Sequence, residues 1–124
     1  MPDKRILLVE DDDDVRFILA ALLERDGYVV DAAGEFSEAM GLLEARPYRL
    51  AIVDWVIPGG DGLTIADAAA DKGSKTILIS GFLFRIPADR IKRHDGTLMK
   101  PVRTSDLIDA VTRAIGSPAE PSAN

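Results

Sequence analysis

Five short apolar runs alternate with helix-type patterns along this chain, and the alternation leaves few folds open. The predicted strands are Arg5–Val9, Tyr28–Ala32, Arg49–Asp54, Thr76–Ser80 and Thr97–Lys100. Most of these runs are rich in Val, Ile or Leu, as buried strands are. Parallel strands need crossover connections, which are usually helices. Five β–α units therefore predict an α/β fold with a doubly wound five-stranded parallel sheet and helices on both faces.

Apolar residues recur at helical spacing between these strands. The predicted helices are Val15–Leu23, Phe36–Leu43, Leu63–Ala70, Pro87–His94 and Leu107–Ile115. Gly27 and Gly116 are the expected stops of the first and last helices, and Thr104 is the expected cap of the last. The segment Pro87–His94 has the weakest pattern, because only Ile91 gives it a clear apolar contact.

The chain is long enough for one domain with its own core and too short for two. It has 124 residues, of which 47% are hydrophobic, and such a length suits a single core. We expect the domain to occupy residues 1–116 and the tail, residues 117–124, to be disordered because it is rich in Pro, Ser and Ala. Met1 and that tail favour a complete protein.

Composition also excludes several kinds of site. The sequence has no cysteine, so disulfides and thiolate metal sites are impossible. No apolar stretch approaches the roughly 20 residues of a spanning helix, and the first residues lack the layout of a signal peptide. A net charge of -6 argues against direct binding of nucleic acid,. The sequence predicts a cytoplasmic protein without membrane insertion.

Acidic residues follow two of the predicted strands. Glu10 and Asp11 come directly after the first strand, and Asp54 ends the third. The carboxyl ends of parallel strands meet at one edge of the sheet, where open α/β proteins place their ligands. Three carboxylates gathered there would repel one another, and a cation among them removes that repulsion. The sequence therefore predicts a cation site at this edge.

The rest of the acidic run has simpler interpretations. Asp12, Asp13 and Asp14 are expected to face solvent or to begin a helix, where carboxylates are favoured by the helix dipole. A calcium loop of the EF-hand type does not fit, because counting from Asp13 puts Ile18 where the turn glycine must be. His94, the only histidine, lies among basic residues and is predicted to be solvated. Trp55 is predicted to be a packing residue beside the predicted cation site.

Four separated motifs together resemble the receiver domain of two-component response regulators. They are Glu10-Asp11, Asp54 with the sequel Pro58–Gly62, Ser80-Gly81 and Lys100-Pro101. Each stands at the carboxyl end of a predicted strand, in the order that the family has. The resemblance extends from about Lys4 to Gly116, which is nearly the whole chain.

The resemblance implies a flavodoxin-like strand order, 2-1-3-4-5, and a site for Mg²⁺. It implies that the metal is held by the carboxylates of Glu10, Asp11 and Asp54 and by the backbone carbonyl of Val56. Mg²⁺ suits such a site because it binds few protein ligands and retains water.

The resemblance also implies a phosphoacceptor. Asp54 would receive a phosphoryl group from a histidine kinase or a histidine phosphotransfer protein, while Lys100 and Ser80 contact the phosphoryl oxygens and Gly81 leaves room for them. Such a protein signals to a downstream partner, which the sequence does not identify, through protein contact. The resemblance implies that the protein is not an enzyme, except that it catalyses its own phosphotransfer and dephosphorylation.

Several positions depart from the family pattern. Thr97 stands where receivers usually have the aromatic switch residue, and the spacings from Asp54 to Ser80 and from Ser80 to Lys100 are short. Phe82–Phe84 adds apolar bulk that is either core or a docking patch. Val56 and Phe82 stand where polar side chains can orient a hydrolytic water in other receivers.

Two other classes of function remain open at this point. One is a degenerate receiver that binds partners without phosphorylation, which Thr97 leaves possible although Glu10, Asp11, Asp54, Ser80 and Lys100 argue against it. The other is a phosphotransferase of the haloacid-dehalogenase type, which also uses an Asp nucleophile. That family needs a second Asp two positions on, where this chain has Val56.

Overall fold

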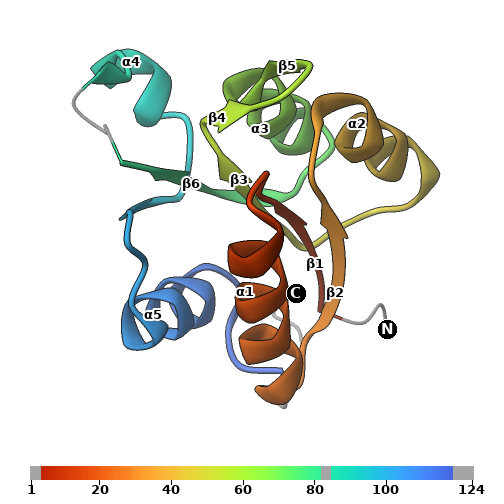
Figure 1. Cartoon of the computed structure of the whole chain (residues 1–124), viewed down its shortest axis with the longest axis vertical. Coiled ribbons are helices and arrows are strands. Elements are labelled where there is room, and N and C mark those ends of the chain that lie inside the picture. Colours follow the sequence, from red (N-terminus) through yellow and green to blue (C-terminus); the bar gives the residue numbers. More distant parts are fainter. Residues whose placement is uncertain (1–3, 82–84, 119–124) are drawn as a thin grey trace.

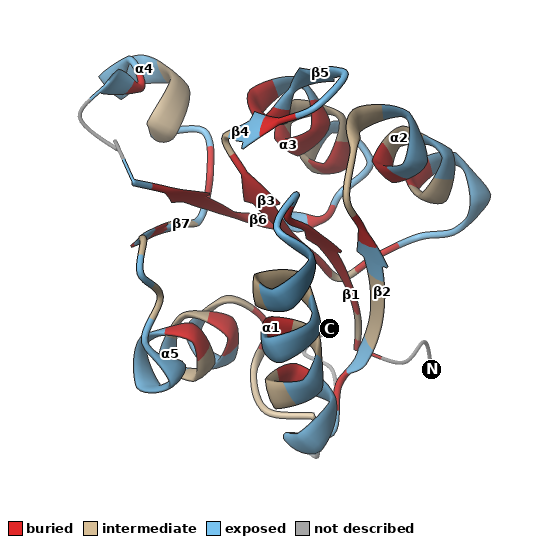
Figure 2. Ribbon diagram, in the orientation of Figure 1, coloured by how far each residue is buried: buried red, intermediate tan, exposed pale blue. Residues whose placement is uncertain are grey.

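The apolar runs form the central sheet of the computed structural model, which describes residues 4–81 and 85–118. The parallel strands are β1 (Arg5–Val9), β2 (Val29–Ala33), β3 (Leu50–Asp54), β6 (Lys75–Ser80) and β7 (Gly96–Met99). They lie side by side in the order β2-β1-β3-β6-β7 (Figure 1; β7 is labelled in Figure 2). Counted within this sheet the order is 2-1-3-4-5, so the predicted fold class is confirmed.

Helices cover both faces of the sheet. They are α1 (Asp13–Arg25), α2 (Phe36–Ala45), α3 (Gly62–Asp71), α4 (Ala88–Ile91) and α5 (Thr104–Ile115). Strand residues alternate between two cores: Leu7 and Val9 of β1 pack with α2 and α3, whereas Ile6 and Leu8 pack with α1 and α5. Both faces of β1, β3 and β6 are therefore buried (Figure 2), which is why their sequences read as continuous apolar runs.

A short hairpin after β3 was not predicted. It pairs β4 (Val56–Ile57) with β5 (Gly60–Asp61) in antiparallel register. Gly59, with φ +86°, supplies the left-handed turn residue,. The hairpin leads directly into α3, where the side chain of Asp61 accepts a hydrogen bond from Leu63 N at 2.9 Å.

Most helix ends agree with the sequence, and two predictions are wrong. Gly27 and Gly116 both have positive φ and end α1 and α5 as expected. Thr104 is not the cap of α5, because Leu107 N bonds to the carbonyl of Arg103, which makes Arg103 the cap position. The helix expected over Pro87–His94 is only four residues long.

The prediction that His94 is solvated is also wrong. Its side chain is 0% exposed. Nδ1 lies 2.8 Å from the hydroxyl of Thr76 on β6, and Nε2 lies 3.1 Å from Oδ1 of Asp67 on α3. The basic neighbours Arg90 and Arg93 pair with acidic residues of α3, and the turn after α4 directs the imidazole inward.

Other sequence expectations concern the ends and surface of the molecule. Phe82–Phe84 and residues 119–124 of the predicted tail lie outside the described residues, so the apolar patch and the disorder of residues 119–124 stay predictions. Within residues 4–81 and 85–118, no helix has the length and apolar character needed to cross a membrane.

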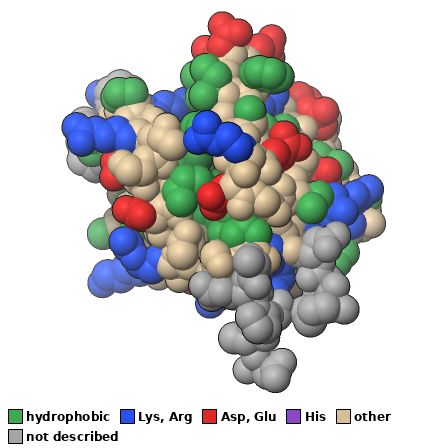
Figure 3. Space-filling model, turned by 90° about the horizontal axis from the view of Figure 1, so that it is seen from below, with side chains coloured by type: hydrophobic (Ala, Val, Ile, Leu, Met, Phe, Trp, Pro, Cys, Tyr) green, Lys and Arg blue, Asp and Glu red, His purple; other side chains and the backbone are tan. Residues whose placement is uncertain are grey.

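Acidic and basic side chains lie side by side on the face shown in Figure 3.

Candidate functional site

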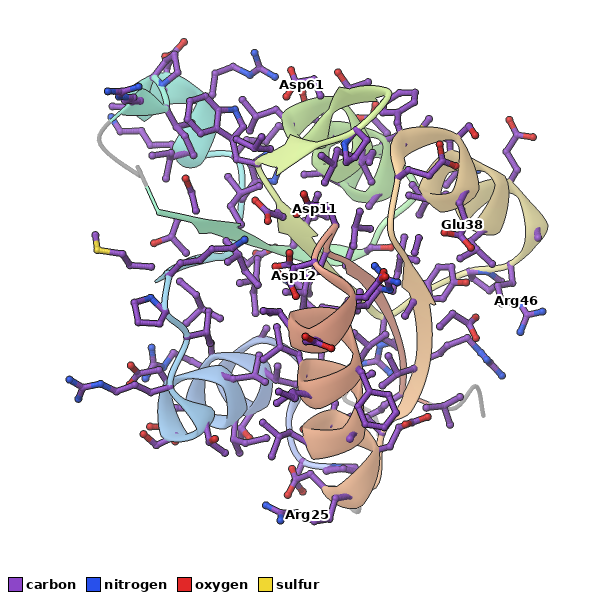
Figure 4. All side chains as sticks on the ribbon, viewed as in Figure 1. Asp11, Asp12, Arg25, Glu38, Arg46 and Asp61 are labelled. Atoms are coloured by element: carbon purple, nitrogen blue, oxygen red, sulfur yellow. The ribbon has the colours of Figure 1, made fainter. Side chains whose placement is uncertain are left out.

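Three carboxylates converge at the carboxyl edge of the sheet. One oxygen from each of Glu10, Asp11 and Asp54 lies within 4.8 Å of the others. Glu10 and Asp54 are almost fully buried, whereas Asp11 is exposed at the entrance to α1 (Figure 4). The sequence-based expectation that these three residues meet is therefore confirmed by the geometry.

The backbone around β1 fixes the position of Glu10. Its N–H donates to the carbonyl of Ala33 at the end of β2, at 3.0 Å. Its Oε2 accepts a hydrogen bond from the backbone N–H of Asp12 at 3.0 Å, and Asp12 in turn caps α1 by accepting from Val15 N at 2.9 Å. Asp12 is thus a helix cap, as its place in the acidic run indicated.

Asp54 is held at the end of β3 by its neighbours. Its Oδ1 accepts a hydrogen bond from Val56 N at 3.0 Å. Trp55 N donates to the carbonyl of Ile79 at 2.9 Å, which keeps β3 aligned with β6 where Asp54 projects. Gly62 allows α3 to begin here, because a Cβ at this position would lie 2.1 Å from the carbonyl oxygen of Asp54.

Lys100 brings positive charge into the carboxylate cluster. Its Nζ lies 2.5 Å from Asp54 Oδ2 and 3.1 Å from Glu10 Oε1. Its backbone N–H donates to the carbonyl of Ser80 at 3.1 Å, so the loop after β7 is tied to the end of β6. Burial alone would lower the pKa of Lys100, but the two carboxylates outweigh it and raise the pKa, which keeps the ammonium charged,.

Burial has the opposite consequence for Glu10. Desolvation is the main cause of its raised pKa, and the negative charge of Asp54 adds to the effect, against the hydrogen bonds from Asp12 and Lys100,. A carboxyl group in this position gains from any further positive charge that enters the pocket. A divalent cation would supply such a charge.

Ser80, Gly81 and Val56 complete the wall of the pocket. Together with Asp11, Asp54 and Lys100 they line a cavity of about 310 Å³. Ser80 is buried at the end of β6, and Val56 is 63% exposed at the start of β4. The structure thus brings together all the residues that the sequence assigned to this site.

The donor set fits Mg²⁺. All three converging groups are carboxylates, the hard oxygen ligands that this ion prefers, and the exposed side of Asp11 leaves space for water ligands,. Glu10 Oε1 is buried and, among the described residues, accepts no hydrogen bond of good geometry, although Lys100 Nζ is near. The Glu10 carboxylate could therefore bind a metal through Oε1 without losing a hydrogen bond at that atom.

Arg16 and Gly34 also contribute to the site, and the sequence did not predict them. Arg16 donates to the backbone carbonyl of Glu10 at 2.8 Å, and Gly34 leaves room for its guanidinium. No local pattern signals this contact, because the two residues come from different β–α units. Only the packing of α1 beside the end of β2 brings them together.

Comparison with known sequences agrees with the geometry. Residues 6–112 match the profile of the response regulator receiver domain. The response regulator receiver protein CpdR of Brucella abortus (strain 2308) is 34% identical over 116 residues, covering 90% of this chain and 97% of CpdR. The transcriptional regulatory protein PdtaR of Mycobacterium tuberculosis is 34% identical over 119 residues, but the chain spans only 57% of its length.

Solved structures show the same fold. The response regulator protein TrrA of Thermotoga maritima, solved in complex with Mg²⁺-BeF, is 28% identical with a TM-score of 0.81, covering 90% of this chain and 99% of TrrA. The chemotaxis response regulator CheY4 of Vibrio cholerae superposes with a TM-score of 0.82 at 20% identity, covering 92% of this chain and 100% of CheY4. The CheY4 similarity supports the fold alone.

Proposed function

This chain belongs to the response regulator receiver domain family, and from that premise we propose that Asp54 is its phosphoacceptor and that Glu10, Asp11 and Asp54 bind Mg²⁺. Receiver domains are phosphoacceptor signalling proteins that are phosphorylated by histidine kinases and bind Mg²⁺ through acidic residues. Membership removes the haloacid-dehalogenase alternative. The position of Asp54 within the carboxylate cluster and beside the ammonium group of Lys100 is the observation that carries the proposal.

The chemistry follows from the charges in the pocket. An oxygen of Asp54 attacks the phosphorus of a phosphohistidine, so that a P–O bond forms as the P–N bond breaks and the imidazole departs with the electron pair. Lys100 lies beside Asp54 Oδ2 and takes up negative charge on one phosphoryl oxygen,. Ser80, which is buried and lines the same pocket, would donate its hydroxyl hydrogen to a second oxygen.

Mg²⁺, when bound, would neutralise the remaining phosphoryl charge. Glu10, Asp11 and Asp54 would hold it, together with the backbone carbonyl of Val56. Gly81 leaves the pocket open beside the end of β6, where the phosphoryl group needs space.

The proposed donor is a histidine kinase or a histidine phosphotransfer protein. The output is contact of the receiver domain itself with a downstream protein in the cytoplasm. Dephosphorylation of Asp54 by water is proposed as the second reaction that the pocket catalyses on itself.

The proposal is tested by measuring the intact mass of the protein after treatment with acetyl phosphate and Mg²⁺. Wild type should gain the mass of one phosphoryl group, and Asp54→Ala should not. Asp61→Ala is a suitable control, because Asp61 is a nearby carboxylate outside the cluster and should leave phosphorylation intact. A phosphorylated Asp54→Ala protein would contradict the assignment of Asp54. An unmodified wild type would also contradict it and would favour a binding module.

A further inference from the structure

The guanidinium of Arg16 braces the turn that carries two proposed metal ligands. Arg16 lies in the first turn of α1, and its Nη1 donates to the backbone carbonyls of Glu10 and Asp11 at 2.8 and 3.4 Å. Its Nη2 donates to Asp13 Oδ1 at 2.5 Å. One planar side chain thus contacts three residues of the segment Glu10–Asp13, through two nitrogens that its plane holds at a fixed separation,.

Gly34 provides the space for this guanidinium. A Cβ on Gly34 would lie 2.7 Å from Arg16 Nη1 and 3.2 Å from Arg16 Cζ, both too close. The φ of Gly34 is not positive, so its backbone conformation is open to other residues. The guanidinium can therefore keep this position only when residue 34 has no side chain. An alanine there would displace the end of a flexible side chain and leave the main chain in place.

Two hydrogen bonds fix the backbone at Ala33 and Gly34, against which the guanidinium of Arg16 packs. Gly34 N donates to Oε1 of Glu38 in α2 at 2.9 Å. The preceding residue, Ala33, accepts from Glu10 N at 3.0 Å. Gly34 and the turn after β1 are therefore held at a set separation, and the Arg16 side chain fills the space between them.

We propose that Arg16, seated on Gly34, is a positioning residue for the Mg²⁺ ligands. By holding the carbonyl groups of Glu10 and Asp11, it fixes the direction in which their carboxylates extend. The inference rests on the proposed function, because it assigns Arg16 a role toward that metal. Groups that orient metal ligands commonly change metal affinity by roughly 10- to 100-fold when they are removed.

The charge of Arg16 alone predicts the opposite effect. A cation on the turn that carries the metal ligands repels Mg²⁺, so loss of this charge would tighten metal binding by Coulomb's law. Loss of positioning would weaken metal binding. The direction of the change in Kd therefore distinguishes a positioning residue from a neighbouring charge.

The test is a titration with Mg²⁺ alone, followed by the fluorescence of Trp55, the only tryptophan, and repeated by calorimetry. Gly34→Ala, Arg16→Gln and Arg16→Lys should each raise the Kd by about tenfold. Two controls should keep the wild-type Kd. Gly41→Ala adds a methyl group where nothing lies within 4 Å, and Arg25→Gln removes a charge from the other end of α1 (Figure 4).

Melting temperatures in EDTA separate positioning from general damage. Gly34→Ala should melt close to wild type, since only the tip of the Arg16 side chain must move. Unchanged or tighter Mg²⁺ binding in Gly34→Ala and Arg16→Gln, with wild type binding normally, would overturn the inference and leave the proposed function intact. A wild type that does not bind Mg²⁺ would overturn both.

Discussion

At the scale of single residues, Lys100 sets the charge balance of the pocket. Its ammonium group lies between Asp54 and Glu10 and offsets part of their repulsion. We expect Mg²⁺ to take over that task when it binds, because a divalent ion offers more charge to the same carboxylates. Lys100 is then available to contact a phosphoryl oxygen. Under the proposed function, Lys100 would thus serve the site both before and after phosphorylation.

Val56 is expected to make loss of the phosphoryl group slow. Its side chain lines the pocket beside Asp54 and cannot hydrogen-bond a water molecule, whereas hydrolysis needs a water that is oriented in line with the leaving oxygen. We predict that Val56→Asn speeds dephosphorylation by roughly tenfold, a small part of what positioning can supply. The measurement is the decay of phosphoprotein with Mg²⁺ and no partner.

Val29→Asn is the matched control for that experiment. Val29 is an exposed valine on β2 and does not line the pocket, so its substitution should leave the decay rate unchanged. Phe82, the other residue expected to exclude water, lies outside the described residues, and Phe82→Glu combined with Val56→Asn should be faster still. Equal rates in wild type and both Val56 variants would show that these side chains do not control access of water.

At the scale of elements, His94 joins three parts of the fold. The imidazole follows α4, contacts Thr76 on β6 and lies against Asp67 on α3. Asp67 also accepts a hydrogen bond from Arg90 at 3.1 Å. Burial lowers the pKa of His94, and the nearby Asp67 charge opposes this only in part,. The folded protein therefore favours the neutral ring.

A pH dependence of stability follows from the lowered pKa of His94. The unfolded chain binds this proton below about pH 6.5, whereas the folded protein binds it only at lower pH. The unfolded state then carries more protons, so stability should fall as pH drops from about 6.5 toward the folded pKa. Urea denaturation at several pH values should show this slope in wild type, and His94→Gln should reduce it.

The difference between wild type and His94→Gln isolates the histidine. Carboxyl groups such as Glu10 titrate in both proteins and cancel, and the chain has no other histidine. A constant stability difference between pH 5 and pH 8, a window that spans the usual pKa of histidine, would mean that the ring has the same pKa in both states. The contacts of His94 would then be structural without a protonation preference.

The elements also show what the sequence could and could not predict. Strands β1, β3 and β6 were predictable because burial on both faces leaves continuous apolar runs,. The hairpin of β4 and β5 was not, since two-residue strands carry no periodicity. The burial of His94 depends on Thr76 and Asp67, which are distant in sequence. The basic residues beside it in the sequence favoured an exposed position, and only the tertiary contacts show that the imidazole is buried.

The edge strand β7 shows where this chain departs from the family pattern. Thr97 is exposed there, and Met99 is 59% exposed. A cavity of about 380 Å³ lies beside Thr97 and is lined in part by the small residues Ala110 and Ala114 of α5. Coupling from Asp54 to this face cannot run through an aromatic ring at position 97. We expect the output of the protein to use other contacts.

At the scale of the whole molecule, the sheet turns four separated motifs into one site. Parallel strands in the order β2-β1-β3-β6-β7 put the carboxyl ends of β1, β3 and β6 at one edge, and the loop after β7 returns Lys100 to it. The sequence could predict this convergence because it follows from topology alone. It could not predict the spacing of the carboxylates, which depends on contacts such as that of Arg16.

Metal binding should therefore stabilise the whole fold. A ligand that binds only the folded state adds about 2.7 kcal/mol at a hundredfold excess over Kd, which corresponds to a rise in melting temperature of roughly 10 °C for a domain of this size. We predict such a rise for wild type with Mg²⁺. Asp11→Asn should abolish it, because that variant removes one of the three converging carboxylates.

The behaviour of Asp11→Asn without metal makes the prediction specific. Since the substitution removes repulsion inside the cluster, the variant in EDTA should be at least as stable as wild type, and only its response to Mg²⁺ should be lost. Asp14→Asn is the control, as Asp14 is an exposed residue of the same acidic run outside the cluster. It should keep the full response. If Mg²⁺ raised the melting temperature of Asp11→Asn as much as that of wild type, the ion would bind elsewhere on the molecule.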